Sequence, residues 1–518
     1  MKKIVFIFLL CVSFTTWSKS KNIKNVILLI GDGMGPQEIS LAQTYLKYAP
    51  HSPFKRKDLY MVSEAKRGHL VLSFTNPYEV LVVDSASSAT QLSTGKFSRS
   101  EMIGLDFEGN SQKTILEIAK EMGKSTGLVS DTRLTHATPA AFAAHVSHRN
   151  LENEIAEQML QNSVDVMLSG GLRHFLPKSI SKEDGESLLR WKEKVPADLK
   201  LKSKREDEKD LLLKAQESGY NLAFSKEQME KISKGKLLGL FSESGMPNGI
   251  WMTQNQNKAD RKIPTLQEMA TTSLKLLSQN PKGFFLMVEG GQIDWAGHAN
   301  DAGTMLHQML HFDETIKLVL DWAAKRDDTV VILTADHETG SFGFSYHQDN
   351  IPEAKKLSGK NFENTLFHPN NNFGNYAILD GLYNQKKTLF DIGLEFSGLP
   401  SQEQTDITLC SLLNETNDFK LTADNCTQLN TSLKNLYGKS LSSYEAYEKT
   451  FLNDDGPVAN LLARAIASQQ NIVWGTGTHT STPVSVQIWG PKHVQERFKG
   501  YLHHTLLGEE MIKILKGI

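Results

Sequence analysis

Short runs of β-branched and other apolar residues recur along this chain, separated by segments with helical spacing. Such runs predict buried strands, and strands that alternate with helices are typical of a mainly parallel sheet covered on both faces. The expected strands are Asn25–Ile30, Ser125–Val129, Val164–Leu168, Phe284–Val288, Thr329–Thr334 and Val484–Trp489. The clearest expected helices are Thr114–Met122, Asn150–Asn162 and Ala302–Ala324. The pattern predicts the α/β class, with a mostly parallel central sheet, flanking helices and surface insertions.

Length alone would suggest two to four domains, but large single α/β domains with insertions reach this size, and we expect one domain over residues 19–518. Of the 518 residues, 39% are hydrophobic and 22% are charged, which supplies a substantial core. The charged stretch Lys182–Glu217 is expected to form solvated helical surface. A stretch from about 345 to 470 has little strand signal and is expected to be an insertion near the site or at a subunit contact. A net charge of -2 does not indicate a nucleic-acid reader.

The first 18 residues have the features of a secretory signal peptide. Lys2 and Lys3 precede an apolar run, Ile4–Phe14, that is short for a transmembrane helix. We expect cleavage near Ser18 and an exported protein, periplasmic or secreted, without a stable membrane anchor. An uncleaved N-terminal anchor is the alternative.

The mature chain would keep two cysteines, Cys410 and Cys426, because Cys11 lies in the predicted signal peptide. Two thiols close in sequence in an oxidising compartment predict one disulfide. Two reduced thiols are the alternative.

Acidic residues and histidines gather at the ends of the predicted strands. They are Asp32 after the first strand, Glu289, Asp294 and His298 after Phe284–Val288, Asp336 and His337 after Thr329–Thr334, and His479 in the loop before Val484–Trp489. Open α/β sheets bind ligands at the carboxyl ends of their strands. Each residue alone has a commoner structural explanation, as a turn former, a helix cap or a structural histidine. Together they suit a hydrolytic site with two divalent cations, which hold the attacking and leaving oxygens of a displacement.

Ser85 lies at the start of a predicted helix, within Val83–Gly95. Free backbone N–H groups at such a start favour phosphate, although the commoner role of a serine there is that of an N-cap. The chain has no G-x-S-x-G motif, so an esterase triad is not indicated. His307 and His311 also have i, i+4 spacing, but they lie in mid-helix and are interpreted as helix surface or interface residues.

Seven motifs taken together resemble the alkaline phosphatase family. They are GDGMG at 31–35, DSASSAT at 84–90, HATPAA at 136–141, AHVSHR at 144–149, VEGGQID at 288–294 with His298, TADHE at 334–338 and THTSTPV at 478–484. The resemblance spans residues 25–489. It implies hydrolysis of small phosphate monoesters through a phosphoserine intermediate, with two Zn²⁺ ions and one Mg²⁺ ion as cofactors.

The resemblance also implies a role for each matching residue. Ser85 is the expected nucleophile, and Arg149 is the arginine expected to grip two phosphate oxygens through its planar fork. The expected metal ligands are Asp294, His298 and His479 for one zinc, Asp32, Asp336 and His337 for the other, and Asp32, Thr138 and Glu289 for magnesium.

Two residues depart from the best-known bacterial pattern of the family. His136 stands where an aspartate is usual near magnesium, and Trp295 stands where a lysine is usual. We expect His136 to affect the third metal site indirectly, with zinc as an alternative to magnesium there. Trp295 is expected to border the phosphate site without a charge. The pair resembles a variant found in some marine and cold-active bacterial relatives.

Two other functions stay open at this point. A phosphodiesterase of the same superfamily shares the bimetal core but usually lacks the arginine and the third metal site. A non-catalytic exported protein that binds metal or phosphate is expected to have lost Ser85 or a zinc ligand. The family is commonly dimeric, which leaves a homodimer open.

Overall fold

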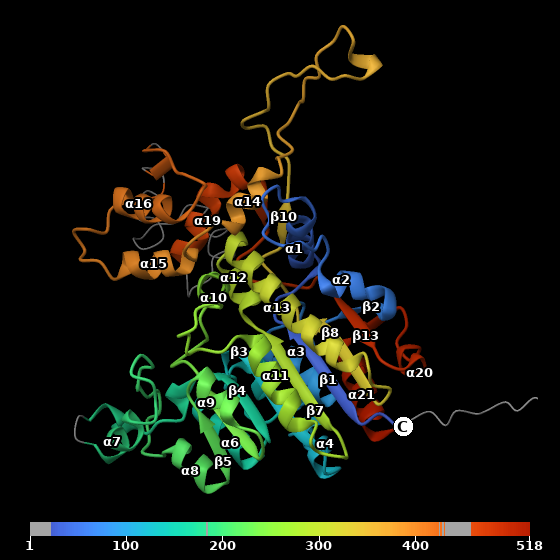
Figure 1. Ribbon diagram of the computed structural model, residues 1–518, viewed down its shortest axis with the longest axis vertical. Coiled ribbons are helices and arrows are strands. Elements are labelled where there is room, and N and C mark those ends of the chain that lie inside the picture. The colour runs from blue at the N-terminus through green and yellow to red at the C-terminus, as the bar shows by residue number, and fades with distance from the viewer. Residues whose placement is uncertain (1–21, 183–184, 424, 427–428, 430–456) are drawn as a thin grey trace, which may run out of the picture.

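The computed structural model describes residues 22–182, 185–423, 425–426, 429 and 457–518 (Figure 1). The predicted signal peptide, residues 1–18, lies outside the described residues. Within the described part of the chain, no helix is long and apolar enough to cross a membrane.

A ten-stranded sheet forms the centre of the molecule, with the strand order β14-β2-β13-β8-β1-β7-β3-β4-β6-β5. Its strands are β1 (Asn25–Gly31), β2 (His69–Phe74), β3 (Ser125–Arg133), β4 (Val166–Gly170), β5 (Tyr220–Ala223), β6 (Lys236–Leu240), β7 (Phe284–Gly290), β8 (Thr329–Ala335), β13 (Val484–Trp489) and β14 (Tyr501–His503). The predicted α/β class and mostly parallel sheet are confirmed. All six expected strands are present, whereas β2, β5, β6 and β14 had not been predicted.

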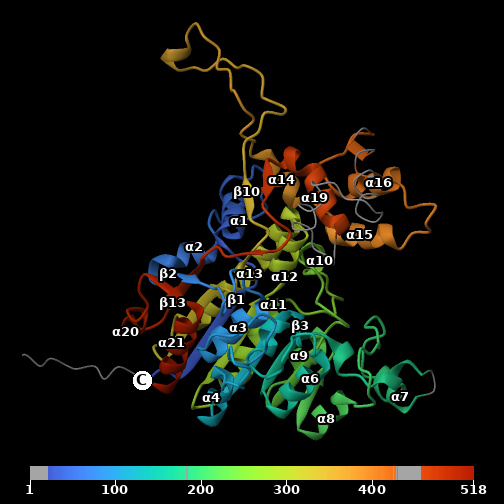
Figure 2. The ribbon, with the colours of Figure 1, turned by 180° about the vertical axis from the view of Figure 1, so that it is seen from behind.

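Helices cover both faces of this sheet, as the two opposite views show (Figures 1 and 2). In chain order they are α1 (Pro36–Tyr48), α2 (Tyr60–Glu64), α3 (Ser85–Thr94), α4 (Ile115–Glu121), α5 (Ala137–Ala140), α6 (Glu152–Gln161), α7 (Glu186–Lys192), α8 (Leu211–Glu217), α9 (Lys226–Lys231), α10 (Gly249–Asn255), α11 (Leu266–Leu277), α12 (Gln292–His298), α13 (Ala302–Ala323), α14 (Ala377–Tyr383), α15 (Leu389–Ser397), α16 (Asp406–Thr416), α19 (Pro457–Gln470), α20 (Lys492–Gln495) and α21 (His504–Lys516). Helices α11 and α13 lie on one face, and α3, α4 and α21 lie on the other.

Strand β1 shows why helices must cover both faces of the sheet. Ile27 and Leu29 are buried in one hydrophobic core, whereas Val26, Leu28 and Ile30 are buried in the other. Successive side chains of a strand point to opposite faces, so a continuous apolar run requires cover on both sides. The continuous run in the sequence therefore specifies a central strand.

One strand of the large sheet, β13, runs against its neighbours, and this reversal shapes the site. It pairs antiparallel with both β8 and β2, whereas the other described pairings in this sheet are parallel. The start of β13 therefore lies at the edge where the parallel strands end. The loop before β13 carries His479, and its short strand β12 (His479–Thr480) pairs with β9 (Glu338–Thr339), directly after β8.

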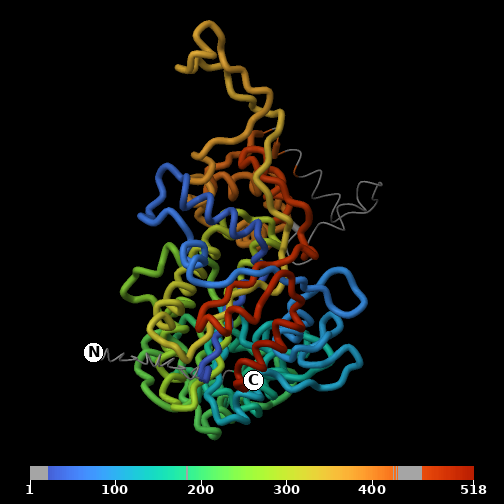
Figure 3. The backbone as a smooth tube through the Cα atoms, turned by 90° about the vertical axis from the view of Figure 1, so that its right-hand side faces the viewer, coloured from blue at the N-terminus to red at the C-terminus, as the bar shows by residue number. Residues whose placement is uncertain are grey.

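The predicted insertion contains a projecting arm and a group of helices. The arm runs from β10 (Phe342–Phe344) to α14 and extends beyond the body of the molecule, whereas α14, α15, α16 and α19 gather at its base (Figure 3). Strand β10 pairs with β11 (Ile472–Trp474), so the two ends of the excursion meet. Cys410 and Cys426 form a disulfide there, which confirms the predicted pairing.

One local prediction holds only in part, and another was wrong. The segment Lys182–Glu217 is only partly solvated, because Trp191 is fully buried and the buried Arg205 pairs with Glu157. His307 is not a surface residue: its side chain is buried, and its Nδ1 lies 2.9 Å from Thr253 Oγ1. The number of charged residues in a segment could not reveal these contacts, because Glu157 and Thr253 lie far in sequence from Arg205 and His307.

Candidate active site

The candidate site lies at the edge where β1, β7 and β8 end and β13 begins. Three groups of side chains have ligand atoms within 4.8 Å of one another. The groups are Asp294, His298 and His479; Asp32, Asp336 and His337; and Asp32, His136 and Glu289. Several strand ends contribute residues to these groups, because parallel strands bring their carboxyl ends to one edge of the sheet. The structure thus brings together the acids and histidines that the sequence predicted at strand ends.

The first group consists of two histidines around one carboxylate. His298 Nε2 lies 3.3 Å from Asp294 Oδ2, His479 Nε2 lies 3.4 Å from Asp294 Oδ1, and the two Nε2 atoms are 3.1 Å apart. The Nδ1 atom of His298 is 2.8 Å from the Gly477 carbonyl, and that of His479 is 2.8 Å from the Val83 carbonyl. Carbonyls only accept, so each Nδ1 donates and the Nε2 lone pairs face inward. This is the donor arrangement of a zinc site.

The second group is fully buried and includes the serine hydroxyl. His337 Nε2 lies 3.4 Å from Asp32 Oδ1, 3.2 Å from Asp336 Oδ2 and 3.2 Å from Ser85 Oγ. Both oxygens of Asp32 and Oδ2 of Asp336 have no hydrogen-bond partner among the described residues. Buried carboxylate oxygens without donors are costly, and a bound cation removes that cost.

Thr339 connects these two groups. Its hydroxyl donates to Asp294 Oδ1 at 2.5 Å and lies 3.2 Å from His337 Nδ1. Because the hydroxyl gives its proton to Asp294, its oxygen accepts from Nδ1–H of His337. This chain leaves Nε2 of His337 free to bind a cation.

The third group surrounds Glu289 at the end of β7. Glu289 Oε2 accepts from Ser130 Oγ at 2.5 Å, whereas Glu289 Oε1, Thr138 Oγ1 and His136 Nδ1 have no hydrogen-bond partner in the described part of the chain. His136 lies within this group, beside Asp32 and Glu289. Buried oxygens beside an imidazole fit a third cation.

Burial, together with neighbouring acids, raises several pKa values in the cation-free chain. Burial, followed by the charges of Asp336 and Asp294, raises the pKa of Asp32 well above its usual range. Burial raises the pKa of Glu289 to about 8 and that of Asp336 to about 6. Burial alone would also raise the pKa of Asp294, but His298 and His479 outweigh it and hold that pKa well below its ordinary value. The site has more acid than its own cationic groups neutralise, so the residues fit divalent ions.

Ser85 is the first residue of α3, and Asp84 is the N-cap. Asp84 accepts from the backbone N–H groups of Ala86 and Ser87, which corrects both the suggestion that Ser85 is the cap and the expectation that these groups are free for phosphate. Asp84 also accepts from Arg149 Nη1 at 3.0 Å. Although burial opposes it, the Arg149 charge helps to hold the pKa of Asp84 below its usual value.

Arg149 and Trp295 both lie beside His136. Arg149 Nη2 is 3.3 Å from His136 Nε2, and the indole of Trp295 meets the imidazole edge-to-face with ring centres 5.9 Å apart. The side chain of Arg149 is 22% exposed, so a dissolved phosphate can reach it. Sequence reasoning missed Thr339 and the hydroxyls of Ser130 and Thr132. Thr339 directly follows TADHE and could have been noticed, whereas nothing in the pattern marked the other two.

The fold and site together define a metal-dependent hydrolase with three candidate cation groups around a serine. The family model for alkaline phosphatase matches residues 23–517. The chain therefore belongs to the alkaline phosphatase family, whose members hydrolyse phosphate monoesters and depend on metal ions.

Known alkaline phosphatases are similar to this chain over most of its length. Alkaline phosphatase 3 of Bacillus subtilis is 29% identical over 95% of this chain and 89% of that protein. The Escherichia coli alkaline phosphatase is 32% identical over 62% of this chain and 71% of that protein. A cold-active alkaline phosphatase from Shewanella sp. has a TM-score of 0.68 and 26% identity, covering 95% of this chain and 99% of the other. The Thermus thermophilus alkaline phosphatase has a TM-score of 0.72 and 23% identity, covering 96% of each chain.

The raised carboxyl pKa values predict how the cation-free chain responds to pH. Folded Glu289, with a pKa of about 8, holds its proton more tightly than the unfolded residue does, so this stabilisation is complete at low pH and is lost as pH rises through 8. We expect the thermal unfolding midpoint in chelator to fall between pH 7 and 9, with a loss of about 1 kcal/mol from such a group. Added Zn²⁺ and Mg²⁺ should stabilise the chain more at pH 9 than at pH 7, as calorimetry can measure.

The matched control is Glu289→Gln, which has no proton to lose. Its midpoint in chelator should change less between pH 7 and 9. A cation-free native chain that becomes more stable across this interval would contradict the expectation.

Proposed function

We propose that this chain is an exported alkaline phosphatase that hydrolyses phosphate monoesters through a phosphoserine on Ser85, using two Zn²⁺ ions and one Mg²⁺ ion. The observation that supports this most is the position of Ser85 Oγ, 3.2 Å from His337 Nε2 in a buried group with unpaired carboxylate oxygens. A serine hydroxyl is a weak nucleophile unless a base or a cation activates it.

Each group of side chains would hold one cation. Asp294, His298 and His479 would hold one zinc, and Asp32, Asp336 and His337 the second. Asp32 and Glu289 of the third group, together with the hydroxyl of Thr138, would hold the magnesium. When bound, the ions lower the pKa of the serine hydroxyl and of water and stabilise the negative charge of the displaced oxygen. The imidazole of His136 beside the third group favours zinc more than the usual carboxylate does, so zinc would compete with magnesium there.

Ser85 would be the phosphate acceptor. Its Oγ gives up its proton and attacks phosphorus while the bond from phosphorus to the alcohol oxygen breaks, and that oxygen leaves with the electron pair and takes up a proton. Water then attacks the phosphoserine, which releases inorganic phosphate and restores Ser85. The cap that Asp84 provides fixes the first turn of α3, so Oγ is held toward the metal groups.

Arg149 would bind the phosphoryl group. Guanidinium has five N–H donors, of which one is used by Asp84 and another faces His136. The remaining donors can grip two oxygens of a phosphate in a fork. A monoester presents three non-bridging oxygens, so one is left to face the metal groups when the fork holds two, whereas a diester presents only two and has none left. Trp295 would border the same site without adding charge.

Activity measurements test this mechanism directly. Hydrolysis of an aryl phosphate should disappear in chelator and return when zinc and magnesium are restored. Ser85→Ala should lower kcat by at least about a thousandfold, because the covalent route is lost. Arg149→Ala should raise the inhibition constant of inorganic phosphate about tenfold or more, since a charge-assisted bond contributes about 1.5–3 kcal/mol.

Other outcomes would reject specific parts of the proposal. Full activity of Ser85→Ala, or activity that survives chelation, would overturn the serine mechanism. Faster turnover of an aryl phosphodiester than of the monoester would favour the phosphodiesterase. Phosphate binding without any hydrolysis would favour a non-catalytic protein.

A homodimer is part of the proposal, and the projecting arm would supply its contact. The arm extends beyond the body of the molecule (Figure 3). It exposes three aromatic side chains to solvent, Tyr346, Phe373 and Tyr376, which are 61%, 67% and 56% accessible. Exposed aromatic side chains of this size are typical of protein interfaces. A second copy of the chain would cover them.

Sedimentation velocity tests the dimer. The native chain should sediment as a dimer at micromolar concentration, and a variant with Tyr346, Phe373 and Tyr376 all replaced by serine should shift toward monomer. Leu189→Ser, which removes an exposed apolar residue from the distant α7, is the control and should remain dimeric. A native chain that sediments as a monomer would contradict the proposed homodimer.

A further inference from the structure

Alternating side chains at the end of strand β3 contact two parts of the site, Glu289 and the start of helix α12. Ser130 and Thr132 both place a hydroxyl on Glu289 Oε2, at 2.5 and 3.4 Å. Asp131, between them, points to the other side, as successive residues of a strand do. The pairing of β3 with β4 is irregular between Val129 and Arg133, and such irregularities redirect side chains near sites.

Asp131 binds the start of α12. Its Oδ1 accepts from the backbone N–H groups of Gly291, at 2.6 Å, and Gln292, at 3.3 Å. Gly291 is the N-cap residue of α12 and provides no side-chain cap of its own. A carboxylate from another strand therefore satisfies N–H groups that would otherwise lack partners at the start of this helix.

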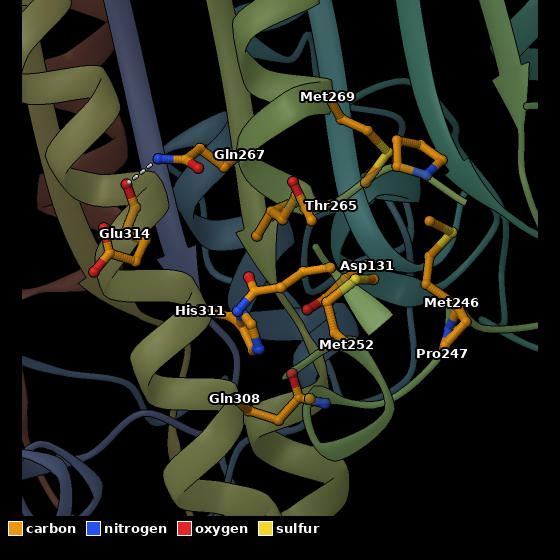
Figure 4. A pocket seen from close by; sticks show the side chains of 14 residues that line it. Asp131, Met246, Pro247, Met252, Thr265, Gln267, Met269, Gln308, His311 and Glu314 are labelled. Atoms are coloured by element: carbon orange, nitrogen blue, oxygen red, sulfur yellow. Dashed lines mark hydrogen bonds between the residues drawn. The ribbon is translucent and has the colours of Figure 1, made fainter. Parts of the chain in front are cut away.

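Gln292 makes a second connection at the same place. Its Nε2 donates to the Asp131 carbonyl at 2.7 Å and to the Met246 carbonyl at 2.8 Å, and its Oε1 accepts from Gln308 Nε2 at 3.1 Å. Figure 4 shows Asp131 and Gln308 among the side chains that line a pocket between α10, α11 and α13. This polar network fixes the beginning of α12 to β3 and to α13.

Helix α12 carries two side chains of the first metal group. Asp294 and His298 lie in its seven residues, so a rotation or shift at the start of so short a helix moves both. The backbone of Gly291 lies close against β3, since a Cβ added there would lie 2.4 Å from Thr132 Cγ2. The orientation of the two side chains thus depends on the backbone at Gly291 and Gln292.

We propose that Asp131 is a positioning residue for the metal group formed by Asp294, His298 and His479. It acts through α12 and touches neither cation nor substrate. The inference rests on the proposed function, because it assumes that this group holds a zinc ion. Residues that orient metal ligands change metal affinity by about 10–100-fold when they are replaced.

Zinc affinity, measured by equilibrium titration in metal buffers, tests this role without any activity assay. In Asp131→Ala, one of the two zinc equivalents should bind about 10–100-fold more weakly, whereas the other should keep its native affinity. Asp131→Asn keeps an acceptor oxygen, so its loss should be smaller. Cobalt spectra of the loaded variants should show an altered band for one site only.

Asp210→Ala is the matched control. Asp210 also caps a helix, since it accepts from Leu213 N at 3.0 Å, but helix α8 carries no side chain of the candidate site. This variant should lower the thermal unfolding midpoint and leave both zinc affinities native. The Asp131→Ala variant should differ from it in affinity even where the two midpoints fall equally.

The outcomes separate this inference from the proposed function. Native zinc affinity at both sites in Asp131→Ala, or in Asp131→Asn where the alanine variant does not fold, overturns the positioning role and makes Asp131 a stabilising cap. A native chain that binds no zinc overturns the proposed function, and the inference with it.

Discussion

The structure depends on the repulsion among carboxylates that the fold buries at one edge of its sheet. Asp32, Glu289, Asp294 and Asp336 are nearly or completely inaccessible to solvent, and two histidines beside them already bind Asp294. Proteins rarely bury so many acids without counter-charge, because desolvating a carboxylate is costly. Divalent cations would meet that requirement, and in the proposed mechanism the same arrangement places the Ser85 hydroxyl beside them. Stability and chemistry therefore depend on the same ions.

The sheet topology explains how residues far apart in sequence reach this edge. Asp32 and Asp336 follow β1 and β8, so parallel pairing alone brings them together. His479 comes before its strand, and it reaches the same edge because β13 runs in the opposite direction. Contacts behind the metal groups then fix the details: Thr339 links two groups, and Asp131 fixes the start of the helix that carries Asp294. Small shifts in these supports are expected to change metal affinity first.

The sequence predicted the central strands well because their apolar runs are continuous and their ends carry unusual acids. It missed short strands such as β5 and β14, whose four and three residues carry little pattern. Asp32 and His337 could be predicted as site residues from strand ends, and family motifs added Arg149. The supporting contacts could not be predicted, because Ser130 and Glu289 are 159 residues apart in sequence and meet only where their strands pair. His307 was misjudged for the same reason, since its partner Thr253 lies on another helix.

The most direct test of the central claim is to find where phosphate is attached during turnover. The cation-loaded enzyme would be mixed with a phosphate monoester, quenched in acid and analysed by peptide mass spectrometry. Phosphate should be found on Ser85 of the loaded chain and on no residue after chelation. Phosphate on another residue, or equal labelling of Ser85 in loaded and chelated protein, would contradict it.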